Sequence, residues 1–171
     1  MNEYAFTLII DGDVESHLDE LFEAGCDDAT FGSVDGTQYA DFDREASSLS
    51  AAIASAIAAV ESVDNLGVVR VEPDELVTQA EIAKRLQRTR ESIRLLASGR
   101  RRSGSFPPPA SHIHHKSRLW RWSDVAAWAG KDDQRVADAR VLAAWNAALE
   151  LRKSGDALPP EARELIAPLL V

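Results

Sequence analysis

The 171-residue chain contains a single cysteine, which excludes an internal disulfide framework. It lacks any apolar run of roughly 18 residues, the length that a membrane-spanning helix needs. The apolar run over 4–10 has neither the basic start nor the cleavage region of a signal peptide, so we expect a cytoplasmic protein. Glycine-rich phosphate loops, HExxH metal helices and repeats are also missing. The sequence therefore predicts no enzyme, no cofactor and no metal site.

Basic residues are scarce in residues 1–75, which hold 2 Lys/Arg and 18 Asp/Glu. Residues 76–122 instead hold 11 Lys/Arg and 2 Asp/Glu, a local charge of +9 in a chain whose net charge is −9. If these charges served only solubility, they could be spread evenly over both segments of the chain. The segregation therefore indicates that residues 76–122 bind a polyanion.

A helix-start pattern opens the basic segment. Thr78 can cap a helix, and Glu81 stands at the position that completes a capping box. Val77 and Ile82 occupy the two positions of a hydrophobic staple. We therefore predict a helix that begins after Thr78 and runs to about residue 86.

A second helix is predicted from the cap residue Thr89 to about Gly99, after a short turn. At about 100° per residue, Ile93, Leu96 and Ala97 face inward, which leaves Leu95 on the opposite face. The candidate DNA contacts of this helix are Thr89, Arg90, Glu91, Arg94 and Ser98. An arginine here can donate twice to guanine; the alternative is a surface ion pair of Arg90 or Arg94 with Glu81 or Glu91.

Beyond this helix, alternation of apolar and polar residues predicts a short hairpin with strands over 112–114 and 118–122. The hairpin would form a basic wing. Its histidines, at positions 112, 114 and 115, are interpreted as polar wing residues, because a metal site would need further ligands. The arginine run before the hairpin is either a phosphate-binding loop or a solvated surface. The candidate DNA contacts outside the helix are Arg100, Arg101, Arg102, Lys116 and Arg118.

A short helix is predicted after the hairpin, with Ser123 as its cap. Val125 and Trp128 of this helix would close over the same small core. Trp120 and Trp122 are also interpreted as core residues rather than as surfaces on which bases stack. The reason is that the wing and the helix after it need large apolar side chains to form a core.

These segments resemble the winged helix-turn-helix domains of the MerR and phage-excisionase type. The matching residues are 76–83, 89–90, 106–107 and 118–128, and the resemblance from its first to its last match covers about a third of the chain. The resemblance implies a recognition helix in the major groove and a wing on the flanking backbone or minor groove. Here the wing segment is longer and richer in Pro and His than in excisionases. MerR-type proteins dimerise through a C-terminal helix, so the resemblance also implies a homodimer.

Residues 1–73 alternate between strand and helix patterns. Strands are predicted over 4–10, 29–33, 38–42 and 66–71, and helices over 13–24 and 48–63. The Asp35-Gly36 pair predicts a hairpin turn between the second and third strands. The order βαββαβ predicts a ferredoxin-like domain, in which two helices cover one face of an antiparallel sheet. The inward side chains should be Val14, Leu18, Leu21 and Phe22 in the first helix, and Leu49, Ile53, Ile57 and Val60 in the second.

The predicted N-terminal fold implies no function by itself. Cys26 has no neighbouring His or Lys in the sequence that would activate its thiol. Arg44 and Arg70 should pair with nearby acids. Segments 25–29 and 42–46, followed by a winged helix, resemble a bacterial family without a characterised activity. The acidic domain could bind a protein or small-molecule effector, orient the protein on DNA, or compete with DNA for the basic segment.

The C-terminal residues predict a long helix over 132–153 and a short helix opened by Pro160. The apolar set of the long helix is too broad for one narrow stripe, so part of it could contact a second subunit. We thus predict an α+β protein with an acidic domain over 1–73, a DNA-binding domain over 74–130 and dimerising helices over 131–171.

The predicted function is sequence-specific binding of double-stranded DNA by a transcriptional regulator. Two alternatives remain open. One is an excisionase-like architectural protein that directs recombination. The other is an antitoxin-like interaction protein, whose acidic domain binds a basic partner while the winged helix regulates its own gene.

Overall fold

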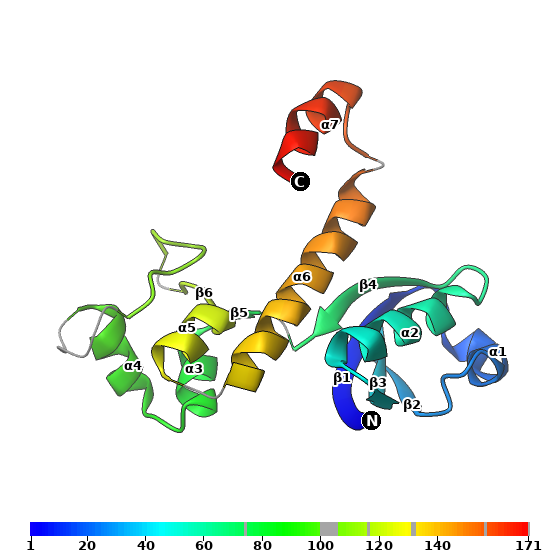
Figure 1. Ribbon diagram of the computed structural model, residues 1–171, viewed down its shortest axis with the longest axis horizontal. Coiled ribbons are helices and arrows are strands. Elements are labelled where there is room, and N and C mark those ends of the chain that lie inside the picture. The colour runs from blue at the N-terminus through cyan, green and yellow to red at the C-terminus, as the bar shows by residue number, and fades with distance from the viewer. Residues whose placement is uncertain (74, 100–105, 116, 131–132, 156, 171) are drawn as a thin grey trace. The chain divides into compact units, whose positions relative to one another are not determined.

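The computed structural model describes residues 1–73, 75–99, 106–115, 117–130, 133–155 and 157–170 (Figure 1). The fold is a mixed α+β arrangement with an antiparallel sheet and several helices. The chain divides into two compact units. One unit comprises residues 1–73 together with 144–171, and the other comprises residues 74–143. Among the described residues, no helix has the length and apolar character needed to cross a membrane.

The first unit is built on a four-stranded antiparallel sheet. Its strands are β1 (Asn2–Asp11), β2 (Ala29–Val34), β3 (Thr37–Ala46) and β4 (Gly67–Glu72), in the spatial order β2-β3-β1-β4. The turn between β2 and β3 has positive φ at both central residues, 49° at Asp35 and 80° at Gly36. Two positive φ angles give the twist that a two-residue hairpin needs, so the predicted hairpin turn is confirmed.

The core of the first unit lies between this sheet and α2 (Leu49–Glu61), which runs beside the strands in Figure 1. Phe6 of β1 stacks on Phe42 of β3, with ring centroids 5.4 Å apart. Ser48 caps α2 by accepting a 3.1 Å hydrogen bond from the Ala51 N–H. The inward positions predicted for this helix are confirmed as buried: Leu49, Ile53, Ile57 and Val60.

The prediction for the first helix is wrong in part. A 3₁₀ turn, η1 (Glu15–His17), precedes a short α1 (Leu18–Glu23), so the expected stripe over 13–24 does not keep one helical register. Val14 and Leu21 are buried as expected. Leu18 and Phe22, however, are 44% and 66% exposed.

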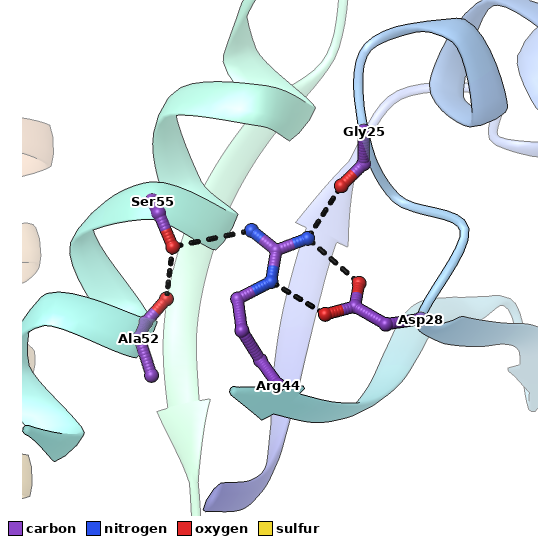
Figure 2. A network of polar contacts seen from close by, with 5 residues as sticks. All are labelled: Gly25, Asp28, Arg44, Ala52 and Ser55. Atoms are coloured by element: carbon purple, nitrogen blue, oxygen red, sulfur yellow. Dashed lines mark hydrogen bonds and ion pairs between the residues drawn. The ribbon is translucent and has the colours of Figure 1, made fainter. Parts of the chain in front are cut away.

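Both arginines of residues 1–75 pair with acids, as predicted. Arg44 is buried and donates from Nε and Nη2 to the two carboxylate oxygens of Asp28, each at 2.7 Å (Figure 2). The same guanidinium also donates to the Gly25 carbonyl and the Ser55 hydroxyl. Arg70 pairs with Glu72 at the surface, at 2.6 Å. Nearby, burial raises the pKa of the Cys26 thiol, which keeps it in its unreactive protonated form.

The long helix α6 (Asp133–Gly155) supplies side chains to the β4 edge of the sheet. The Asn146 amide accepts from the Val71 N–H at 2.8 Å and donates to the Val71 carbonyl at 2.9 Å. Arg152 donates to the Val68 carbonyl and pairs with Glu61 of α2. The sequence predicted this helix but not these contacts. A short α7 (Pro160–Ile166) and a 3₁₀ turn, η2 (Ala167–Leu170), follow.

The second unit has a small core of its own. Its elements are β5 (Leu76–Val77), α3 (Gln79–Arg85), α4 (Arg90–Ala97), β6 (Trp120–Arg121) and α5 (Trp122–Trp128). Trp120 is 1% exposed, and Trp122 and Trp128 pack against the same cluster, so their predicted core role is confirmed. The buried members of the cluster are Val77, Ile82, Ala83, Leu86, Ile93, Leu96, Trp120 and Val125.

Candidate nucleic-acid interface

The start of α3 is fixed by the capping box that the sequence predicts. Glu81 accepts a 2.7 Å hydrogen bond from the Thr78 N–H, and Thr78 Oγ1 accepts one from the Glu81 N–H. The hydrogen bonds from the Thr78 backbone and hydroxyl lower the pKa of the Glu81 carboxyl. Val77 and Ile82 are both fully buried. The local sequence thus determines where the first helix of the basic unit begins.

A tight turn joins α3 to α4. The Arg88 N–H donates to the Ala83 carbonyl at 2.8 Å, and the Gln87 N–H donates to the Lys84 carbonyl at 3.2 Å. Gln87 has a left-handed φ of 53°. This pattern of bonds is a Schellman motif, which ends one helix and redirects the chain within two residues. Thr89 then caps α4 by accepting from the Ser92 N–H at 3.1 Å, as predicted.

Helix α4 turns its apolar side into the core and its charged side outward. Ile93 and Leu96 are buried and Ala97 is half-buried, which confirms the predicted inward face. Leu95 is also half-buried. The candidate DNA contacts of this helix are all exposed: Thr89, Arg90, Glu91, Arg94 and Ser98. The structure therefore brings these five residues to one accessible surface, which we call the α4 face.

An ion pair occupies the middle of the α4 face. Arg94 donates from Nε and Nη2 to the two oxygens of Glu91, at 2.7 and 2.6 Å. This is one of the surface pairs that the sequence left open as an alternative to base contact. Hydrogen bonding to Glu91 raises the pKa of Arg94, which is charged in any case. The pair is solvent-exposed and therefore weak, so a better acceptor can displace it.

Two further arginines beside α4 were missed by the sequence analysis. The guanidinium of Arg85 lies 5.0 Å from the ring centroid of Trp122, and that of Arg88 lies 5.6 Å from that of Trp128. These cation–π contacts hold the two guanidinium groups against tryptophans that pack on the core of the second unit. A signal was present, because both residues lie in the basic segment directly before Thr89. They extend the cationic surface onto the end of α3 and the turn.

The predicted wing hairpin is wrong in its strand pairing. Trp120 and Arg121 pair with Val77 and Leu76, and a single bridge joins Ser111 to Leu119. Residues 112–114 form no strand. His112 has a left-handed φ of 54° and its carbonyl accepts from the His115 N–H at 2.9 Å, so this stretch is a turn. The chain segment before α3 supplies the strand partner that the sequence assigned to the histidine segment.

The helix start after β6 also differs from the prediction. Ser123 was expected to cap α5, but the helix begins at Trp122 and Ser123 lies inside it, buried. Its hydroxyl donates to the buried carboxylate of Glu75 at 2.6 Å. Arg121 pairs with the same carboxylate at 2.8 Å, and the Trp122 N–H donates to the Glu75 carbonyl. Glu75, which the sequence analysis did not single out, joins β5 to the start of α5.

The remaining candidate residues are only partly placed. Arg118 is exposed on the segment that leads into β6. Within the described parts of the chain, the side chains of Lys84, Arg90 and Arg118 form no hydrogen bond or ion pair. The other predicted contacts, Arg100, Arg101, Arg102 and Lys116, lie outside the described residues. Comparison of the chain with protein-family models, with curated proteins and with solved structures gave no match.

Proposed function

We propose that the protein binds double-stranded DNA in a sequence-specific manner and acts as a transcriptional regulator. In this proposal α3 and α4 form a helix-turn-helix, α4 enters the major groove, and Arg118 and Lys116 contact the flanking backbone as part of a wing. Residues 1–73 form a ferredoxin-like domain that binds an effector or orients the protein on the duplex. The observation that carries the proposal is the α4 face, which presents Arg90 and Arg94 on a capped helix after a tight turn.

Two physical arguments favour duplex DNA over a different polyanion. A rigid helix with outward cations fits the width of the major groove, where an arginine can bind guanine O6 and N7 together. The tryptophans of this unit pack in or against its core, so they are poorly placed to stack on the bases of a single strand. Arg85 and Arg88 flank the helix and suit phosphate contact.

The test begins with selection of bound fragments from a pool of random-sequence duplexes, because the operator is unknown. Arg94→Ala should reduce discrimination at one base pair by about 1–3 kcal/mol, since a bidentate base contact is lost. Arg118→Ala should weaken all duplexes alike and lower the slope of log K against log[salt] by about 1. Arg70→Ala is the matched control, because it removes an exposed arginine of the first unit.

The proposal fails if the full chain binds no duplex at low ionic strength, or if Arg94→Ala and Arg118→Ala give the same sequence-blind loss. A stretch of selected sequence with two inverted half-sites about one duplex turn apart would support our further proposal of a homodimer. Clustered direct repeats, with a bent duplex, would instead favour the excisionase-like architectural role. Light-scattering mass, with and without the selected duplex, measures the subunit number directly.

A further inference from the structure

The two edges of the four-stranded sheet differ in whether their outer backbone groups have hydrogen-bond partners. At the β4 edge, Asn146 and Arg152 bond to backbone groups of Val71 and Val68. At the β2 edge, among the residues that the structure describes, no strand or side chain covers the outer backbone groups. β2 also contains no charged residue and no proline, the usual devices that protect an edge strand. This edge is therefore open to pairing with an added strand.

The pairing pattern identifies which backbone groups of β2 are available. The Asp43 N–H donates to the Asp28 carbonyl, and the register continues as Thr30 opposite Asp41 and Gly32 opposite Tyr39. Bonded and non-bonded pairs alternate in an antiparallel ladder, so Phe31 and Ser33 direct their N–H and C=O groups away from β3. These are the groups that an added strand would bind.

An apolar hollow of about 310 Å³ lies next to this edge. Its lining includes Val14, Leu18 and Phe31, together with the polar Ser33 and Gln38. Phe22, one turn along α1 from Leu18, is 66% exposed. Leu18, which lines the hollow next to β2, is itself 44% exposed, so a large apolar side chain is accessible beside an unprotected strand. Exposed apolar surface of this kind is a common mark of a binding site.

The surroundings of the hollow are acidic. Glu15 is part of the lining, and Asp19, Glu20 and Glu23 are exposed on α1. In the described part of the chain, none of these four carboxylates forms a hydrogen bond or ion pair through its side chain. A second copy of this chain would bring the same carboxylates against them, and like charges at short range repel. A partner with lysine or arginine side chains would instead be complementary.

We propose that the β2 edge and the adjacent hollow form a docking site for an extended, basic segment of a different protein. The segment adds a strand to β2 through the backbone of Phe31 and Ser33, as in other cases of strand addition. One apolar side chain enters the hollow against Leu18 and Phe31, and lysine or arginine side chains pair with Glu15 and Asp19. This site belongs to the first unit and shares no residue with the α4 face, so the proposal does not rest on DNA binding.

The test uses the full chain and a synthetic peptide in which lysine alternates with valine and isoleucine. The peptide should bind, and amide chemical shifts should change at Phe31 and Ser33. A matched peptide with glutamate in place of lysine should not bind. Binding of both peptides alike would overturn the proposal, because the carboxylates would then have no role in selecting the partner.

Three variants locate the site. Ser33→Pro removes an outward donor and should abolish peptide binding, while Leu18→Ser should weaken it about tenfold. Leu165→Ser is the control, because it removes an apolar side chain that is 78% exposed on α7. The far-ultraviolet circular dichroism of each variant shows that it is folded. Unchanged binding by a folded Ser33→Pro variant, or self-association that is lost in Leu18→Ser without any peptide binding, would overturn the proposal.

Discussion

In the acidic residues 1–75, both arginines form ion pairs with carboxylates. Arg44 of β3 is only 8% exposed, because its side chain lies between the sheet and α2 (Figure 2). In the basic residues 76–122, both acids also have partners within the fold: Glu81 completes a capping box and Glu91 forms an ion pair with Arg94. In each region the minority charge is used within the fold. Much of the majority charge is on the surface, although Glu75 is buried and pairs with Arg121.

The same comparison underlies the two proposals of different partners. Glu15 lines the apolar hollow beside the open β2 strand and the carboxylates of α1 are exposed, which supports the proposed peptide site. The cations of the second unit on α4 and on the turn before it support the proposed duplex contact. In both proposals the surface charge sets the sign of the partner's charge, and the local backbone sets the partner's shape.

The largest expected effect separates a buried ion pair from an exposed one. Arg44→Ala removes a guanidinium whose side chain is 10% exposed and leaves Asp28 without its partner, so the free energy of unfolding should fall by about 4 kcal/mol. Arg94→Ala breaks an ion pair of the same bidentate geometry at 50% exposure and should change the free energy of unfolding far less, because water screens the exposed pair. Urea unfolding of both variants measures the difference. Equal losses would break the comparison.

The next effect tests whether the α4 face depends on the core beneath it. Ile93→Ala leaves a cavity in the small cluster of the second unit and should cost about 3 kcal/mol. Duplex binding should weaken in parallel, because the outward arginines lose a rigid support. Amide hydrogen exchange should speed up in α3 and α4 and stay unchanged in β1 and β3. Faster exchange in the sheet would mean that the two regions are not stabilised separately.

A smaller effect concerns Glu81, the minority charge that closes the capping box. Thr78→Ala should cost about 1 kcal/mol at neutral pH. The pKa of the Glu81 carboxyl is lowered in the folded protein by its hydrogen bonds to Thr78. Its contribution is therefore complete above the ordinary glutamate pKa and is lost as pH falls through the lowered folded value. Thermal unfolding between neutral and acid pH should show the wild type and the variant converging in acid.

The smallest effect concerns the exposed pair on the α4 face. Glu91→Gln should change the free energy of unfolding by less than about 0.5 kcal/mol, because both partners are solvated. It removes one negative charge from a surface proposed to face phosphates, so binding to random duplex should tighten about twofold at low salt. Fluorescence anisotropy measures this directly. Weaker binding to random duplex would show that Glu91 holds Arg94 in its binding position.

Local sequence signals predicted much of the fold. The capping box at Thr78, the cap at Thr89, the Asp35-Gly36 turn and the buried stripe of α2 are all confirmed. Each depends on side chains and backbone groups within a few residues of one another. The candidate contacts on α4 follow from the same periodicity, and all of them are exposed.

The errors arise where a segment has several potential partners. Trp120 and Arg121 have a strand-like sequence, but nothing in that sequence states whether residues 112–114 or 76–77 will pair with them. Leu18 and Phe22 fit an inward stripe, yet the 3₁₀ turn before α1 changes which side of the helix meets the sheet. Arg85 and Arg88 gain their defined positions from tryptophans that are remote in the sequence.

The sequence by itself determined the segregation of charge, the positions of most helices and the outward face of α4, because these follow from composition and from contacts between near neighbours. The tertiary structure alone decided that Leu76 and Val77 pair with β6, that Glu75 is buried against Ser123, and that Asn146 covers the β4 edge while β2 stays open. The physical reason is that strand pairing and the satisfaction of buried polar groups join residues far apart in the chain. Those contacts are chosen by competition within the folded molecule.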